Sequence, residues 1–127
     1  MKTPSPIAVI VAFFGGYVIP TALLFATGAA AVASADGNAI SSPGLSLLIL
    51  SSYVVSPLLA GFLAGHLARQ APFLHAVAAS LLGSAMYAFM QESITVADSI
   101  WWLAINAVGA IAGAWLATLR QQAAPSE

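Results

Sequence analysis

The strongest constraint in this sequence is that its few charged residues leave four long apolar runs intact. The runs cover about residues 7–32, 44–68, 72–90 and 100–119. About 20 apolar residues in a helix suffice to cross roughly 30 Å of hydrocarbon. Only 6% of the 127 residues are charged and 61% are hydrophobic, whereas soluble domains have about 25% charged residues. We therefore expect an all-α integral membrane protein, a single domain of four transmembrane helices in two hairpins.

The composition also excludes several classes of function. The formal net charge is −1, and no basic patch offers a site for the phosphates of a nucleic acid. The absence of cysteine excludes disulfides, thiolate metal sites and iron–sulfur clusters. No Ser/His/Asp set, HExxH motif or phosphate-binding loop indicates catalysis. No charged residue falls inside a span, although proton relays and coupled transporters normally require one. We expect a protein that is not an enzyme and has no cofactor.

Two of the predicted spans contain an internal proline, Pro20 in the first and Pro57 in the second. A proline inside a helix deprives the carbonyl four residues earlier of its donor and kinks the helix. We expect the first span to bend within residues 15–17. In the second span, Ser52 or Ser56 can compensate by bonding to the backbone near the kink.

The first apolar run has an alternative reading as a signal peptide. Lys2 would form its basic start, and residues 33–35 (ASA) would form an A-x-A cleavage site. The apolar part of a signal peptide has about 7–15 residues, and this run is longer. We expect the run to remain in the protein as a membrane anchor.

The segments between the runs carry turn-forming and polar residues. We expect loops at residues 36–43 and 91–99, and a flexible tail at residues 120–127. Pro72 suits the first turn of the third helix, and Asp98 or Ser99 can cap the fourth. Three tryptophans near the span ends suit the headgroup level of a bilayer: Trp101, Trp102 and Trp115.

The basic residues predict the orientation, because lysine and arginine concentrate in cytoplasmic loops. All three basic residues fall on one side of a four-span arrangement: Lys2, Arg69 and Arg120. Three of the four acids fall on the other: Asp36, Glu92 and Asp98. We expect a multi-pass protein of the bacterial inner (plasma) membrane with both termini in the cytoplasm.

Glycine pairs at GxxxG spacing occur in the second and fourth spans. GFLAG contains Gly61 and Gly65, and GAIAG contains Gly109 and Gly113. Such pairs let helix backbones approach closely, so we expect these four residues to pack against each other or against a second copy. The two segments also share a Leu-Ala step and an Arg-Gln end, which fits either a parallel repeat of two hairpins or chance in a sequence rich in Ala, Gly and Leu.

Polar side chains at depth within the spans are candidates for a narrow polar seam. Asn106 is the most polar of them, and it can hydrogen-bond to another helix or contact a solute. The seam would comprise Tyr17, Tyr53, Ser80, Ser84, Tyr87 and Asn106.

His66 and His75 flank the turn between the second and third spans. Imidazole is a common metal ligand, so the two residues are weak candidates for haem or metal binding. No carboxylate is placed to complete their site, and two histidines alone are an incomplete ligand set. We expect them to contact headgroups and water at the membrane surface.

The hairpin GFLAGHLARQAPFLHA, residues 61–76, resembles that of many short four-span bacterial inner-membrane proteins of unknown function. Their hairpins typically read Gly-aromatic-x-Ala-Gly/Ala-x-x-Ala, a basic cluster, Pro, two apolar residues and His. The chain departs from them at His66 and Gln70, where basic residues are more usual, so the resemblance carries no phosphate or headgroup role. It implies a four-span membrane protein without a stated activity. The matching positions are Gly61, Phe62, Ala64, Gly65, Ala68, Pro72 and His75.

These features lead to two hypotheses about function. The first is a non-enzymatic accessory or interaction subunit that assembles through its small-residue helix faces, as a homo-oligomer or in a larger membrane complex. The second is a small oligomeric channel or carrier for a small solute, with the polar seam as its path.

Overall fold

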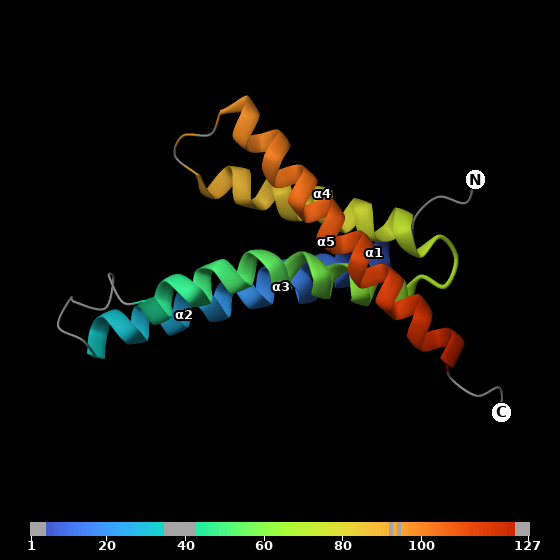
Figure 1. Ribbon diagram of the computed structural model, residues 1–127, viewed down its shortest axis with the longest axis horizontal. Coiled ribbons are helices and arrows are strands. Elements are labelled where there is room, and N and C mark those ends of the chain that lie inside the picture. Colours follow the sequence, from blue (N-terminus) through green and yellow to red (C-terminus); the bar gives the residue numbers. More distant parts are fainter. Residues whose placement is uncertain (1–4, 35–42, 92, 94, 124–127) are drawn as a thin grey trace.

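The computed structural model describes residues 5–34, 43–91, 93 and 95–123 (Figure 1). These residues form helices and no strand, which confirms the all-α fold for the described part of the chain. The first span is one continuous rod of three pieces, and each later span is a single helix. The elements are α1 (Pro6–Phe13), the π-helical turn η1 (Phe14–Val18), α2 (Ile19–Ser34), α3 (Pro43–Leu67), α4 (Pro72–Met90) and α5 (Val96–Ala123).

Four helical stretches of the described chain are long and apolar enough to cross a membrane: Pro6–Ala31, Ser46–Leu67, Pro72–Met90 and Val96–Ala123. Many of their large apolar side chains point outward, among them Ile7, Leu50 and Phe89. Exposure of so many apolar side chains to water would be unfavourable. Lipid chains are as apolar as these side chains and can surround them without that cost. The chain is a multi-pass membrane protein.

The interior is built from small side chains instead. Fully buried alanines come from all four spans: Ala12, Ala60, Ala64, Ala76, Ala79, Ala110, Ala114 and Ala117. Small residues at helix interfaces let the backbones come close together, so that van der Waals contact holds the helices. The fold therefore depends on close helix packing rather than on burying large side chains.

The first span changes its helical geometry at η1. The Ile19 N–H bonds to the carbonyl of Phe14, five residues earlier rather than four. This turn includes the residues where we expected a bend before Pro20. The second span, α3, continues through Pro57 as one helix. The kinks expected at Pro20 and Pro57 remain predictions.

The serines near Pro57 do not bond as expected. The Ser52 hydroxyl donates to the Ile49 carbonyl at 2.7 Å, one turn before the carbonyl that Pro57 leaves free. The buried Ser56 hydroxyl has no partner among the described residues.

The expected N-cap of the fourth helix was wrong. The helix begins at Val96, so Asp98 and Ser99 lie within its first turn. Thr95 is the cap: its Oγ1 accepts from the Asp98 N–H at 3.1 Å, and Asp98 Oδ2 accepts from the Thr95 hydroxyl at 2.6 Å. The pair forms a capping box, with an acid in the third position of the helix. The fourth helix consequently starts four residues earlier than the apolar run.

The spans form two arms that meet at one end of the molecule and separate toward the other (Figure 1). At the basic end, defined by Arg69 and Arg120, α1 begins and α3 and α5 end. At the open end, α2 ends and the turn between α4 and α5 lies. Helix α5 crosses α3, and these two helices have the most extensive packing in the described chain. Helix α1 packs against both α3 and α4.

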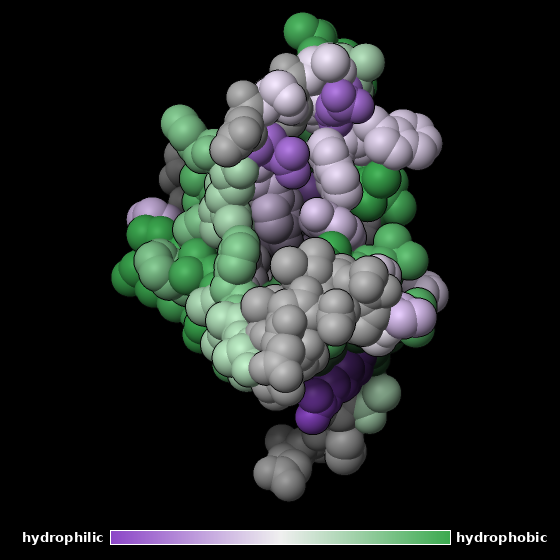
Figure 2. Space-filling view, turned by 90° about the vertical axis from the view of Figure 1, so that its left-hand side faces the viewer, coloured by the Kyte–Doolittle hydropathy of each residue, from purple (hydrophilic) through white to green (hydrophobic). Residues whose placement is uncertain are grey.

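The surface agrees with this arrangement. Seen from the open end, apolar residues cover the flanks, and polar residues gather over the ends of α4 and α5 (Figure 2). Residues 36–42 of the loop predicted at 36–43 lie outside the described residues, and Pro43 opens α3. The flexible tail predicted at residues 120–127 was wrong for residues 120–123, which continue α5, and residues 124–127 lie outside the described residues.

Candidate functional site

The centre of the molecule holds a buried hydrogen bond between the first and last spans. Tyr17 lies in the π-helical turn, and its hydroxyl donates to Asn106 Oδ1 on α5 at 3.1 Å. Asn106 Nδ2 donates in turn to the Trp102 carbonyl at 2.9 Å. A Cβ at Gly83 of α4 would overlap the Tyr17 ring, so glycine at this position leaves room for it. Three spans together therefore fix the position of Tyr17.

Aromatic rings continue from Tyr17 toward the open end. The Tyr17 and Tyr87 ring centroids are 6.0 Å apart in an edge-to-face arrangement, and Tyr87 and Tyr53 are 5.9 Å apart in another. Tyr53 then contacts Trp102, at 4.6 Å between centroids. Edge-to-face and offset contacts are the arrangements that the ring quadrupole favours. The rings link all four spans into one aromatic cluster.

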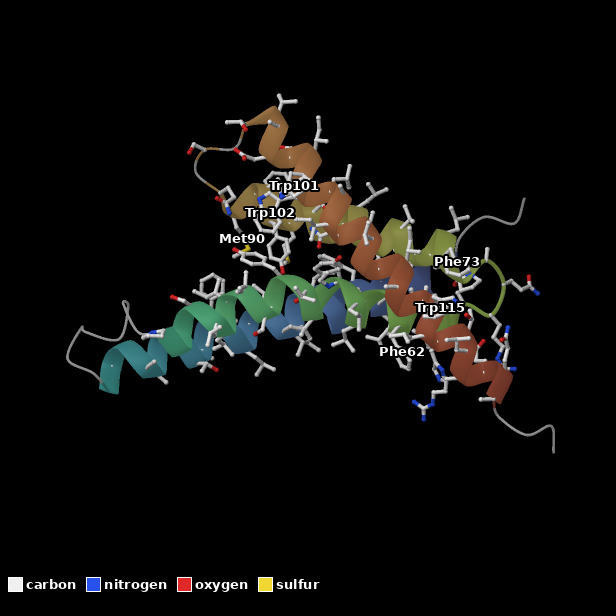
Figure 3. The ribbon with its side chains drawn as sticks, viewed as in Figure 1. Phe62, Phe73, Met90, Trp101, Trp102 and Trp115 are labelled. Carbon is white, nitrogen blue, oxygen red and sulfur yellow. The ribbon has the colours of Figure 1, made fainter. Side chains whose placement is uncertain are left out.

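A cavity of about 260 Å³ lies beside this cluster, between the α4–α5 hairpin and Tyr53 of α3. Trp102 lies in its wall, on the part of α5 nearer the open end (Figure 3). The wall is largely aromatic and apolar, with Gln91 and Ser99 at the open end. The lining residues are Tyr53, Leu81, Ser84, Ala85, Tyr87, Ala88, Gln91, Ser99, Trp102 and Leu103.

Three of the residues that line this cavity carry hydroxyl groups without a hydrogen-bond partner among the described residues. The buried Ser84 Oγ has no hydrogen-bond partner among the described residues. No hydrogen bond to the Tyr53 or Tyr87 hydroxyl is found there either. A buried polar group without a partner is costly. The cavity wall therefore includes residues whose hydroxyl groups the described chain leaves unbonded.

The described lining of the cavity is aromatic, apolar and neutral. Among the described residues that line it, none is Asp, Glu, Lys, Arg or His. Aromatic faces and a few neutral polar groups are the usual composition of a small-molecule pocket between bundle helices.

The structure brings most of the predicted seam together, but in two different roles. Tyr53, Ser84 and Tyr87 line the cavity, while Tyr17 and Asn106 bond to each other behind it. Ser80 is fully buried, and its hydroxyl donates to the Val77 carbonyl at 2.8 Å.

Trp102, Gln91 and Ser99 are site residues that the sequence interpretation missed. Trp102 was assigned to the membrane surface together with Trp101 and Trp115. Trp102 and Asn106 are four residues apart and therefore lie on the same face of α5. This spacing could have predicted that Trp102 lies beside the polar seam.

The four predicted packing glycines lie at the crossing of α3 and α5. A Cβ at Gly61 would overlap the Ala110 carbonyl oxygen, and one at Gly113 would overlap the Leu58 carbonyl oxygen. A Cβ at Gly65 would lie 3.0 Å from the Ala114 Cα, and one at Gly109 would lie 2.9 Å from the Pro57 Cγ. The two motifs therefore face each other within the chain.

His66 and His75 have separate surroundings. His66 is exposed, and its ring stacks on Phe62 with 6.3 Å between centroids. His75 is buried: its Nε2 accepts from the Ser5 N–H at 2.7 Å, and its Nδ1 lies 2.9 Å from the Ala71 carbonyl oxygen. In the described part of the chain, no group of three His, Cys, Asp or Glu residues is placed to hold a metal ion.

No protein family model, curated protein or solved structure matches this chain. The function is therefore inferred from the geometry of the site itself.

Proposed function

We propose that this chain is a non-enzymatic membrane protein that binds a small uncharged solute in the cavity between α3, α4 and α5, and acts as a carrier or channel for it. The observation that carries the proposal is the buried Ser84 hydroxyl without a partner in the wall of an aromatic cavity. Such a group favours a ligand that offers it a hydrogen bond.

The lining defines the chemical class of the solute. Since none of the described lining residues is charged, an ion would lose its hydration without compensation from them. The rings of Tyr53, Tyr87 and Trp102 favour a planar or apolar body, and the hydroxyls favour one or two polar groups on it. A volume of about 260 Å³ limits the solute to a small molecule.

The position of the cavity suggests the route of entry. Gln91 and Ser99 line it at the open end, where the α4–α5 turn lies. The basic residues favour a cytoplasmic location for the opposite end. In the bacterial inner membrane, a solute would accordingly enter from the outer face, and both termini would be cytoplasmic.

Solute flux into proteoliposomes tests the proposal. Vesicles with the purified chain are challenged with a panel of small neutral solutes, such as urea, glycerol and benzyl alcohol, and their swelling is compared with that of empty vesicles. We expect faster entry of at least one solute, and a loss of that flux in Ser84→Leu, which fills the cavity. Trp101→Ala is the matched control, because Trp101 neighbours Trp102 in sequence but does not line this cavity. Equal rates with and without protein would refute transport of those solutes.

A second candidate is the accessory or interaction subunit, within a homo-oligomer or a larger complex. It is favoured by the separation of the two arms toward the open end, which leaves apolar side chains such as Leu50 and Phe89 widely exposed. The glycine motifs do not supply this interface, because they are already packed together. The intact mass of the complex, extracted gently from native membranes, tests it. A heteromeric mass supports an accessory subunit, and a lone monomer contradicts it.

A further inference from the structure

The basic end contains a second cavity, which the proposed solute site does not involve. It has a volume of about 450 Å³ and is lined by Phe62, His66, Arg69, Arg120 and Gln121. Arg69 belongs to the turn between α3 and α4, and Arg120 belongs to the last turns of α5. Fold topology thus brings together the two arginines of a chain that has only three basic residues.

Among the described residues, no acid lies near the two guanidinium groups. Asp98 is the one acid among the described residues, and it is bonded to Thr95 at the far end of α5. Neither arginine forms an ion pair or hydrogen bond within the described chain. Two like charges at one cavity repel each other, and an anion between them converts this repulsion into attraction.

The protein holds this cavity in a defined shape. Gln121 Nε2 donates to the Gly65 and His66 carbonyl oxygens, at 3.3 and 3.4 Å. These bonds fasten the end of α5 to the end of α3, and so keep Arg120 on the same cavity as Arg69. The stacked rings of Phe62 and His66, parallel to within 5°, form a flat wall.

The surroundings place the cavity at the membrane surface. On α5, Trp115, Leu116 and Leu119 precede Arg120 and are exposed, as side chains facing lipid are. Arginine matches the geometry of a phosphate, because its planar fork donates two parallel hydrogen bonds to two oxygens. Basic pockets at this level of a membrane protein fit lipid head groups.

We propose that Arg69 and Arg120 form a binding site for a phosphate group, and that the phosphate belongs to an anionic lipid headgroup. His66 and Gln121 complete the polar wall, and Phe62 lies against the apolar part of the lipid. The site does not depend on solute binding near Tyr53, so either proposal can fail alone.

A binding titration tests the site. The full chain in neutral detergent is titrated with short-chain phosphatidylglycerol, and the matched titrant is phosphatidylcholine, whose phosphate is neutralised by its choline. We expect binding of the anionic lipid only. A hydrogen bond to a charged group contributes about 1.5–3 kcal/mol, so we expect about a 10-fold or greater loss of affinity for Arg69→Gln and likewise for Arg120→Gln.

Two control variants separate a built site from general attraction. The double variant R69K/R120K keeps both positive charges but lacks the planar guanidinium groups that donate two parallel hydrogen bonds. We expect it to bind the anionic lipid more weakly than the wild type. Lys2→Gln removes one positive charge and leaves both arginines in the sequence, and we expect wild-type affinity. Unchanged binding in R69Q/R120Q, or an equal loss in Lys2→Gln, would overturn the proposal. Both arginines are exposed and line the cavity, so we expect the variants to keep the helix packing. Elution at the wild-type volume and an unchanged thermal unfolding temperature check this.

Competition identifies the source of the phosphate. If glycerol 1-phosphate and inorganic phosphate fail to displace the lipid, the ligand is a lipid headgroup, as we propose. If either displaces it at a concentration comparable to that of the lipid, the phosphate chemistry stands and the lipid assignment is overturned.

Discussion

The Tyr17 hydroxyl donates to Asn106 Oδ1 at 3.1 Å and joins residues that are 89 positions apart in the sequence. Both side chains are almost completely buried. The bond connects the first span to the last, which carries Arg120 at one end and part of the cavity wall at the other. It therefore ties α5, the helix that contributes to both candidate sites, to the first span.

A double-mutant cycle on Tyr17→Phe and Asn106→Leu measures this bond. Interhelical hydrogen bonds in membranes contribute about 0.6 kcal/mol on average and up to about 1.7. We expect a coupling free energy in that range, obtained from unfolding of the four proteins in mixed micelles with increasing SDS. Additive effects of the two substitutions would show that the bond contributes nothing to stability.

Gly61→Ala and Gly113→Ala are expected to be strongly destabilising. The new methyl groups would meet the carbonyl oxygens of Ala110 and Leu58, which belong to helix backbones and cannot turn aside. Overpacking of this kind costs about 1–3 kcal/mol, and thermal unfolding in detergent should reveal it. Gly44→Ala is the matched control, since a Cβ there meets nothing within 4 Å. Equal stability of all three variants would contradict close packing of α3 on α5.

His75→Leu is expected to release the start of α1 from α4. Nε2 of His75 accepts from the Ser5 N–H, so the proton of the neutral ring is on Nδ1, which points at the Ala71 carbonyl oxygen. Loss of the ring leaves the Ser5 N–H without its acceptor, whereas the Ala71 carbonyl oxygen still accepts from the backbone N–H of residue 75, at 3.3 Å in the wild type. A hydrogen bond of this kind contributes about 0.5–1.5 kcal/mol to stability. Limited proteolysis should then cut near the N-terminus faster. Partial protection in His75→Gln, which retains an acceptor, would distinguish the bond from simple loss of packing.

Single cysteines test the predicted orientation, because the natural chain has none. Ser93→Cys places a thiol in the α4–α5 turn, and Ala123→Cys places one at the end of α5. A membrane-impermeant maleimide applied to intact cells should label Ser93→Cys alone, and both variants after lysis. The reverse pattern would show that the basic end faces outward.

The fold class could be predicted from the sequence because four apolar runs of this length and composition are compatible with few folds other than four membrane-spanning helices. Stretches without charged residues indicated where the spans lie, but hydropathy alone did not predict where each helix begins and ends. Residues 96–99 belong to α5 although they include Asp98, because the Thr95–Asp98 capping box allows the helix to extend beyond the apolar run.

The candidate sites were less accessible from sequence. The seam residues were named as a set because hydroxyl and amide groups are rare within the spans. Their division into a bonded pair and a cavity wall depends on how α4 and α5 meet α3, and no local pattern encodes this. The same holds for Arg69 and Arg120, which indicate only a membrane side until the helix crossing places them on one cavity.

The π-helical turn at Phe14–Val18 sets the phase of the first span. An α-helix advances about 100° per residue, so one extra residue in a turn rotates everything after it by that angle. The number of residues in η1 therefore determines which face of α2 packs against α3, and the composition of α2 does not. Removal of one residue within η1 would leave length and hydropathy almost unchanged, yet turn a different side of α2 toward the lipid.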